Sequence, residues 1–74
     1  MIGYEAATRQ AALEQAAKDK IWSAAERKVL QALADGEGFD ENVGTGRVYW
    51  LPGHRIRFYI HESTVGYNIG RCGK

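Results

Sequence analysis

The spacing of apolar residues changes about halfway along this chain of 74 residues. In the first half apolar positions recur with the three-to-four-residue period of an amphipathic helix, and later they alternate every second residue, as in a half-buried strand. The elements predicted are helices over residues 4–19 and 24–34 and strands over residues 46–51, 55–61 and 64–71. We therefore expect residues 1–74 to form one α+β domain, with two N-terminal helices packed on one face of a three-stranded antiparallel meander, in the order ααβββ.

The sequence supports the second helix better than the first. Residues 4–19 are rich in alanine, which has a high helix propensity but buries little area per residue. Ser23 and Glu26 have the spacing of a capping box, and Gly36 follows as a C-terminal cap. The apolar stripe of this helix consists of Ala25, Val29, Leu30 and Leu33. One bent helix is the alternative, because no glycine or proline separates the two; the capping box favours a break.

The last two strands have a register that burial selects, because partners on antiparallel strands share a face. The pairs that gather apolar residues on one face are Ile56 with Ile69, Phe58 with Tyr67, and Ile60 with Val65. This register leaves Glu62-Ser63 as a two-residue loop. It also places Tyr59 across from Gly66, so that an aromatic ring covers a strand glycine.

The turn at Pro52-Gly53-His54 decides which side chains of the preceding strand face the core. A two-residue Pro52-Gly53 loop mixes apolar and charged residues on each face. A three-residue loop directs Val48 and Trp50 to the core and leaves Tyr49 beside Arg57 on the outer face. We expect the three-residue loop; with the shorter one, Tyr49 and Trp50 would exchange faces.

The outer face of the predicted sheet is the candidate binding surface. Its residues are Arg47, Tyr49, Arg55, Arg57, Tyr59, His61 and Asn68. Tyr and Arg are frequent hot-spot residues in protein interfaces. Arginines interleaved with aromatic residues also suit phosphate contacts and base stacking. An ordinary solvated face is the third interpretation, because antiparallel sheets are often polar on one side.

Charge is divided unevenly along the chain. The formal net charge of +1 combines −3 over residues 1–46 with +4 over residues 47–74. The basic second part fits an acidic partner or head-to-tail self-association. Cys72 is the only cysteine, which excludes an internal disulfide and favours a cytoplasmic location. The N-terminus does not read as a signal peptide, and no run approaches the roughly 20 apolar residues of a membrane span.

The sequence gives little support for a catalytic site or a metal-binding site. His54, His61 and Cys72 match none of the compact zinc spacings, so we expect no metal and no cofactor. A metal-free ribonuclease is the enzyme that the residue types allow. His61 or Tyr59 would act as the acid or base, and Arg55 with Arg57 would hold the phosphate.

The stretch from Gly53 to Ile60 (Gly-His-Arg-Ile-Arg-Phe-Tyr-Ile) resembles the sheet of RelE/ParE-type toxins, which also place two helices before antiparallel strands. The resemblance covers that end of the chain only. It implies no catalytic residue here, and the chain departs from the family in its first strand, because residues 1–19 read as helix.

Together these patterns predict a small, non-enzymatic cytoplasmic protein that docks on a larger acidic protein or nucleoprotein complex and modulates or inhibits it. Phage- or plasmid-encoded inhibitors of host machinery are of this kind. The first alternative is RNA or DNA binding by the same face, and the second is a metal-free ribonuclease-type toxin. No membrane partner is expected. The last strand, residues 64–71, would be an open edge with no charge before Arg71, which would allow a homodimer through it.

Overall fold

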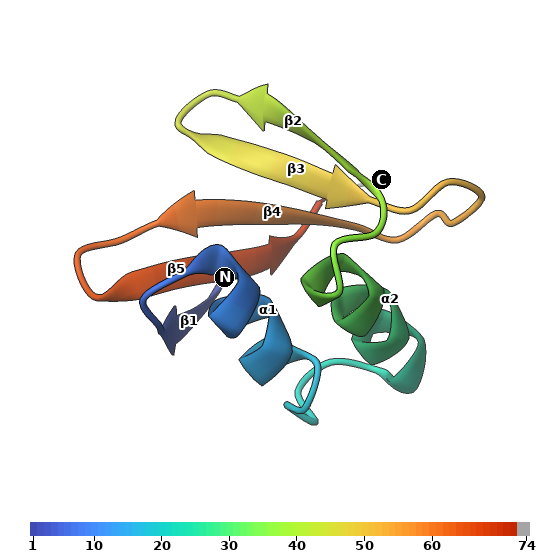
Figure 1. Ribbon diagram of the computed structural model, residues 1–74, viewed down its shortest axis with the longest axis horizontal. Coiled ribbons are helices and arrows are strands. Elements are labelled where there is room, and N and C mark those ends of the chain that lie inside the picture. The colour runs from blue at the N-terminus through green and yellow to red at the C-terminus, as the bar shows by residue number, and fades with distance from the viewer. Residues whose placement is uncertain (73–74) are drawn as a thin grey trace.

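The computed structural model describes residues 1–72, and this part of the chain contains two helices and five strands (Figure 1). In chain order these are β1 (Ile2–Glu5), α1 (Arg9–Ala16), α2 (Ala24–Ala34), β2 (Phe39–Val43), β3 (Gly46–Trp50), β4 (Arg57–Glu62) and β5 (Gly66–Arg71). The strands form one antiparallel sheet in the order β1-β5-β4-β3-β2. The α+β class agrees with the prediction, but the three-stranded ααβββ meander is wrong.

The first helix is shorter than predicted because the chain begins with a strand. Ile2 and Tyr4 alternate with exposed residues and pack against the core. The helix starts only after Thr8, whose hydroxyl accepts a hydrogen bond from the amide of Ala11 at 3.1 Å. In place of a helix over residues 4–19, the chain pairs its first residues with β5, which satisfies backbone groups that two frayed alanine-rich turns would leave to water.

Strand β5 lies inside the sheet, between β1 and β4. Gly66 permits the close approach of β1, because a Cβ atom at this position would overlap the carbonyl oxygen of Tyr4. The edge that a homodimer through residues 64–71 would need is therefore occupied by β1. The edges of the sheet are β1 and β2.

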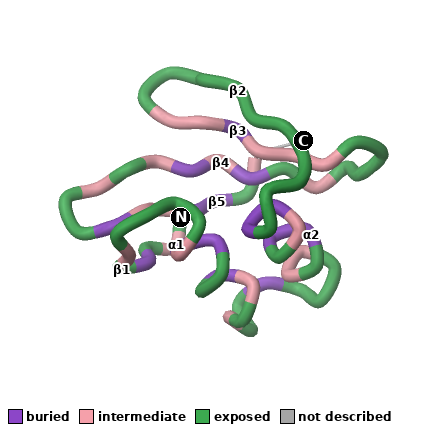
Figure 2. The backbone as a smooth tube through the Cα atoms, viewed as in Figure 1, coloured by how far each residue is buried: buried purple, intermediate pink, exposed green. Residues whose placement is uncertain are grey.

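Strand β2 is formed by residues of the acidic, glycine-rich segment between the predicted helix 24–34 and the predicted strand 46–51. All five of its residues are exposed (Figure 2), and β3 is the only element it contacts in the described part of the chain. Phe39 and Val43 are the large apolar residues of this strand, yet they are 58% and 46% exposed. Neither helix contacts β2, so within residues 1–72 this strand has no core to pack against.

The registers of both predicted hairpins are different in the structure. Tyr49 pairs with Phe58 and Trp50 with Arg57, so residues 51–56 make a six-residue connection in place of the three-residue loop. Tyr49 and Trp50 have consequently exchanged faces. Between β4 and β5 the register moves by four residues, which keeps the paired side chains on their predicted faces. Val65, which was predicted to pair with Ile60 on the core face, instead lies outside the strand and is 66% exposed. Residues 63–65 then form the loop.

The core lies between the sheet and the two helices, which pack against each other on one sheet face (Figure 1). Its largest fully buried side chains are Trp22, Phe58, Leu30, Ile69 and Val29. Trp22 meets Phe58 edge to face, with ring centroids 5.4 Å apart. The break between two helices and the Ser23–Glu26 capping box are confirmed. Val29, Leu30 and Leu33 are buried as predicted, whereas Ala25 is exposed. Within residues 1–72 neither helix has the length and apolar character to cross a membrane.

Candidate functional site

The face of the sheet opposite the helices keeps four of the seven predicted surface residues. Arg57, Tyr59 and His61 alternate along β4 and share this outer face with Asn68 of β5, the direct partner of His61. Neither helix of the described residues 1–72 covers this face (Figure 1). Arg55 lies in the connection 51–56 and is exposed beside β4. The two faces of β4 were therefore predicted correctly, because they depend only on the alternation of side chains along the strand.

Arg47 and Tyr49 lie on the helix side, so their predicted place on the outer face is wrong. Arg47 forms an ion pair with Asp40 on neighbouring β2. The Tyr49 hydroxyl accepts a hydrogen bond from Arg9 Nη1 at 2.7 Å. Burial raises the pKa of Tyr49, and the nearby Arg9 guanidinium opposes this rise. Each side chain thus has a partner on the helix side that the sequence pattern of a single hairpin does not reveal.

Trp50 takes the outer position that was assigned to Tyr49, and it is the centre of a small aromatic cluster. Its ring lies 6.1 Å from the ring of Phe39, centroid to centroid. The guanidinium carbon of Arg57 lies 4.9 Å from the centre of the Trp50 ring, which is cation–π distance. These contacts cross from β2 to β3 to β4, so three adjacent strands contribute.

Tyr59 extends the cluster toward the β2–β3 turn. Its hydroxyl donates to the carbonyl oxygen of Val43 at 3.2 Å. The end of its ring lies against Gly46, where a Cβ atom would be only 2.6 Å from Tyr59 Oη. Tyr59 therefore covers a strand glycine as expected, but the glycine is Gly46; its direct partner in β5 is Gly70, and not Gly66.

We call the residues of this cluster the outer patch: Phe39, Val43, Trp50, Arg57 and Tyr59. Val48 lies among them, opposite Tyr59, and is only 9% exposed although it is outside the main core. The hydrophobic pattern of the sequence does not predict that Phe39, Val43 and Trp50 are surface residues. A turn signal was present at Gly44-Thr45-Gly46, and it could have identified β2 as the partner of β3.

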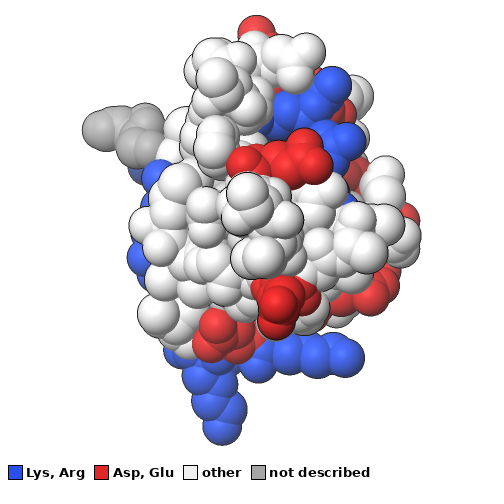
Figure 3. Space-filling model, turned by 90° about the vertical axis from the view of Figure 1, so that its left-hand side faces the viewer, with Lys and Arg blue, Asp and Glu red and all other residues white. Residues whose placement is uncertain are grey.

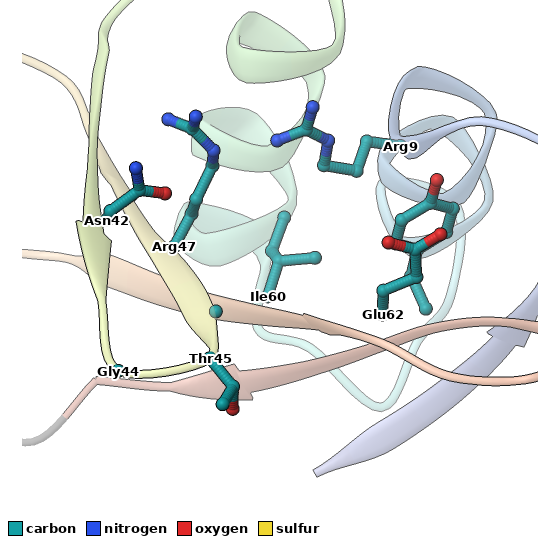
Figure 4. Close-up of a pocket in the computed structure, with 9 residues that line it drawn as sticks. Arg9, Asn42, Gly44, Thr45, Arg47, Ile60 and Glu62 are labelled. Atoms are coloured by element: carbon teal, nitrogen blue, oxygen red, sulfur yellow. The ribbon is translucent and has the colours of Figure 1, made fainter.

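A hollow of about 260 Å³ opens on the helix side of the sheet, beyond the part that the helices cover (Figure 4). Its lining residues are Arg9, Asn42, Gly44, Thr45, Gly46, Arg47, Ile60, Glu62 and Tyr67. The guanidinium groups of Arg9 and Arg47 lie at one side of this hollow, and Glu62 lies beyond Ile60 (Figure 4). The hollow combines one residue from the start of α1 with residues from four strands, so sequence spacing alone could not predict it.

The charges around this end of the molecule are mixed. Figure 3 shows basic and acidic side chains next to each other, within a larger uncharged surface. The basic character of residues 47–74 is partly neutralised, because Arg47 is paired with Asp40 and Arg71 with Glu26. Arg57 is the charged member of the outer patch, and Glu41 of β2, the strand partner of Val48, lies beside it on the same face.

Within residues 1–72, no three His, Cys, Asp or Glu side chains gather into a group that could hold a metal ion. Cys72 is half-buried and free. No family model, curated protein or solved structure matches this chain.

Proposed function

We propose that this chain is a small binding protein that docks on a larger protein through the outer patch and modulates or inhibits it. The observation that supports this proposal is the uncovered cluster of Phe39, Trp50 and Arg57, held together across three strands. Trp, Tyr and Arg are the residue types that contribute most to protein interfaces. Large apolar side chains that are left exposed side by side favour association.

The outer patch is ordered before any partner arrives. Phe39 and Arg57 hold the Trp50 ring from either side, and Tyr59 is fixed by its hydrogen bond to Val43. A preorganised side chain loses less conformational entropy when it is bound, so more of its contact energy contributes to affinity. The partner surface that complements the patch is an apolar socket with an acidic group placed against Arg57.

Nucleic-acid binding is less favoured than the sequence suggested. Affinity for a phosphate backbone rests on the number of cations that contact it. Arg47 has left the outer face and is paired with Asp40, so Arg57 and the neighbouring Arg55 remain there. A protein partner therefore fits the outer patch better than an extended phosphate chain.

The docking proposal is tested by recovering partners from the cells that make this protein. Trp50→Ala should weaken binding to the recovered partner by about 2 kcal/mol, or roughly 30-fold, as expected for a central interface aromatic. Arg57→Glu should weaken it as well, because it removes the cation–π contact and reverses the charge. Lys28, which is exposed on α2, is the control: Lys28→Glu changes the net charge by the same amount and should not affect binding. Equal effects of the two charge reversals would contradict docking by the outer patch.

A metal-free ribonuclease is the second candidate, and one feature of the fold favours it. Strand β1 precedes the two helices, so the chain has the first strand that its sequence did not predict and whose expected absence distinguished it from RelE/ParE-type toxins. Arg57, Tyr59 and His61 share one face, as acid–base chemistry beside a phosphate requires. RNA incubated with the protein and a chelator should then be cleaved, and His61→Ala should abolish this cleavage. Intact RNA, or cleavage that survives His61→Ala, would exclude this activity.

A further inference from the structure

The hollow on the helix side contains two positively charged groups from distant parts of the chain. Arg9 comes from the start of α1 and Arg47 from β3, and their guanidinium groups lie on the same side of the hollow (Figure 4). Arg9 donates to the Tyr49 hydroxyl, and Arg47 donates to Asp40. A guanidinium carries five N–H groups, so each arginine keeps donors for a ligand. Planar, paired donors of this kind bind carboxylate and phosphate oxygens.

A negatively charged group lies at the other end of the hollow. Glu62 is on the same face of β4 as Ile60, two residues further along, and Ile60 pairs directly with Arg47. Glu62 takes part in neither ion pair that the described residues form. Diagonal neighbours on adjacent strands are about 7–8 Å apart. The backbones of Arg47 and Glu62 are therefore about that far apart, and the exposed carboxylate of Glu62 is available to a ligand.

The surface between these two ends is uncharged. Ile60 lies between Arg47 and Glu62 in the floor of the hollow (Figure 4), and the Gly44-Thr45-Gly46 turn adds backbone on one side. A short methylene chain can cross this uncharged floor between the two charged ends, with Ile60 and Tyr67 as its apolar neighbours. The volume of about 260 Å³ is below that of most drug-sized pockets, so a small ligand fits.

The formal charges of the residues that line the hollow, together with that of the adjacent Asp40, sum to zero. Arg9 and Arg47 are balanced by Glu62 and Asp40, so a simple anion would gain attraction from the arginines and lose it to the carboxylates. A molecule with an oxyanion at one end and an ammonium at the other interacts favourably with both ends. We propose that the hollow binds a small zwitterion, with its oxyanion against Arg9 and Arg47 and its ammonium against Glu62.

The test is a titration of the isotopically labelled protein, followed by amide and arginine side-chain NMR signals. The probes are ω-amino carboxylates of increasing length, from glycine to 6-aminohexanoate, each compared with the carboxylate and the amine of equal chain length. One member of the zwitterion series should shift the signals of Arg9, Arg47 and Thr45 and bind at least five times more tightly than its matched carboxylate. The same spectra report whether the protein remains folded.

Two variants make the assignment specific. Glu62→Gln should remove the advantage of the zwitterion over the carboxylate, because the amide no longer offers a charge to the ammonium. Glu37→Gln removes an exposed carboxylate that does not line the hollow and should leave the advantage unchanged. The proposal is overturned if no probe shifts these signals, if carboxylates bind as tightly as the zwitterions, or if Glu62→Gln has no effect.

Discussion

At the scale of single residues, the Tyr4 hydroxyl connects three segments of the fold. It donates a hydrogen bond to Asp19 Oδ2 at 2.7 Å and accepts one from Trp22 Nε1 at 2.8 Å. Tyr4 lies on β1, Asp19 in the connection between the helices, and Trp22 just before α2. This hydroxyl therefore satisfies the indole N–H of the largest buried side chain in the core.

Tyr4→Phe should reduce the free energy of unfolding by about 1–3 kcal/mol, because it leaves the buried Trp22 N–H without an acceptor. Tyr67→Phe is the matched control. Tyr67 is the strand partner of Tyr4, and its hydroxyl makes no hydrogen bond within residues 1–72. Its removal should cost less than about 0.5 kcal/mol. Urea denaturation of both variants measures the difference, and equal losses would contradict this role of Tyr4.

The same hydroxyl should make stability depend on pH. Burial, reinforced by the hydrogen bond to Asp19, raises the pKa of Tyr4 from 10.0 to about 12. Since the folded-state pKa lies above the unfolded value, this stabilisation is complete below pH 10 and is lost as the pH rises toward 12. The hydrogen bond from Tyr4 lowers the pKa of Asp19 below 3.8, so the contribution of Asp19 is lost as the pH falls below that value. Tyr4→Phe should weaken both dependences in denaturation curves recorded across pH.

What the sequence reveals about a residue depends on how local its interactions are. The capping roles of Ser23 and Glu26 were predicted, because both partners lie within one helical turn. The faces of Tyr49 and Trp50 were predicted the wrong way round. Their orientation depends on the length of the connection 51–56 and on partners such as Arg9, 40 residues away from Tyr49.

At the scale of elements, β1 shows how a strand can depend on a glycine of its neighbour. Gly66→Ala should reduce the free energy of unfolding by about 1–3 kcal/mol, because the new methyl group must displace the backbone of β1. Gly3→Ala is the matched control in the same strand pair. A Cβ atom there would meet only the Asn68 side chain, at 3.0 Å, and this side chain can move. A smaller loss for Gly66→Ala than for Gly3→Ala would contradict the pairing of β1 with β5.

The elements that were predicted well are those with a strong internal pattern. α2 has both a capping box and a buried stripe, and its predicted bounds match. β1 and β2 were missed for different physical reasons. The few residues of β1 precede an alanine-rich segment whose propensity favours helix. β2 is exposed on both faces, so it has no alternation of buried and exposed positions to detect.

At the scale of the whole molecule, the sheet separates two different surfaces. The helices cover one face, except at the hollow beside Arg47, while the outer face carries the outer patch. The sequence predicted this two-sided arrangement, with helices on one face and arginine and aromatic side chains on the other. It could not predict which aromatic residue is exposed, because that choice required the correct strand register.

The most direct test of the central claim is site-specific photo-crosslinking in the cells that make the protein. A photo-reactive phenylalanine analogue replaces Phe39 in the outer patch, where the side chain is 58% exposed. In the control it replaces Lys28, which is exposed on α2. We predict a discrete protein adduct from position 39 that Trp50→Ala abolishes, and no such adduct from position 28. The same adduct from both positions, or adducts from position 28 alone, would contradict docking through the outer patch.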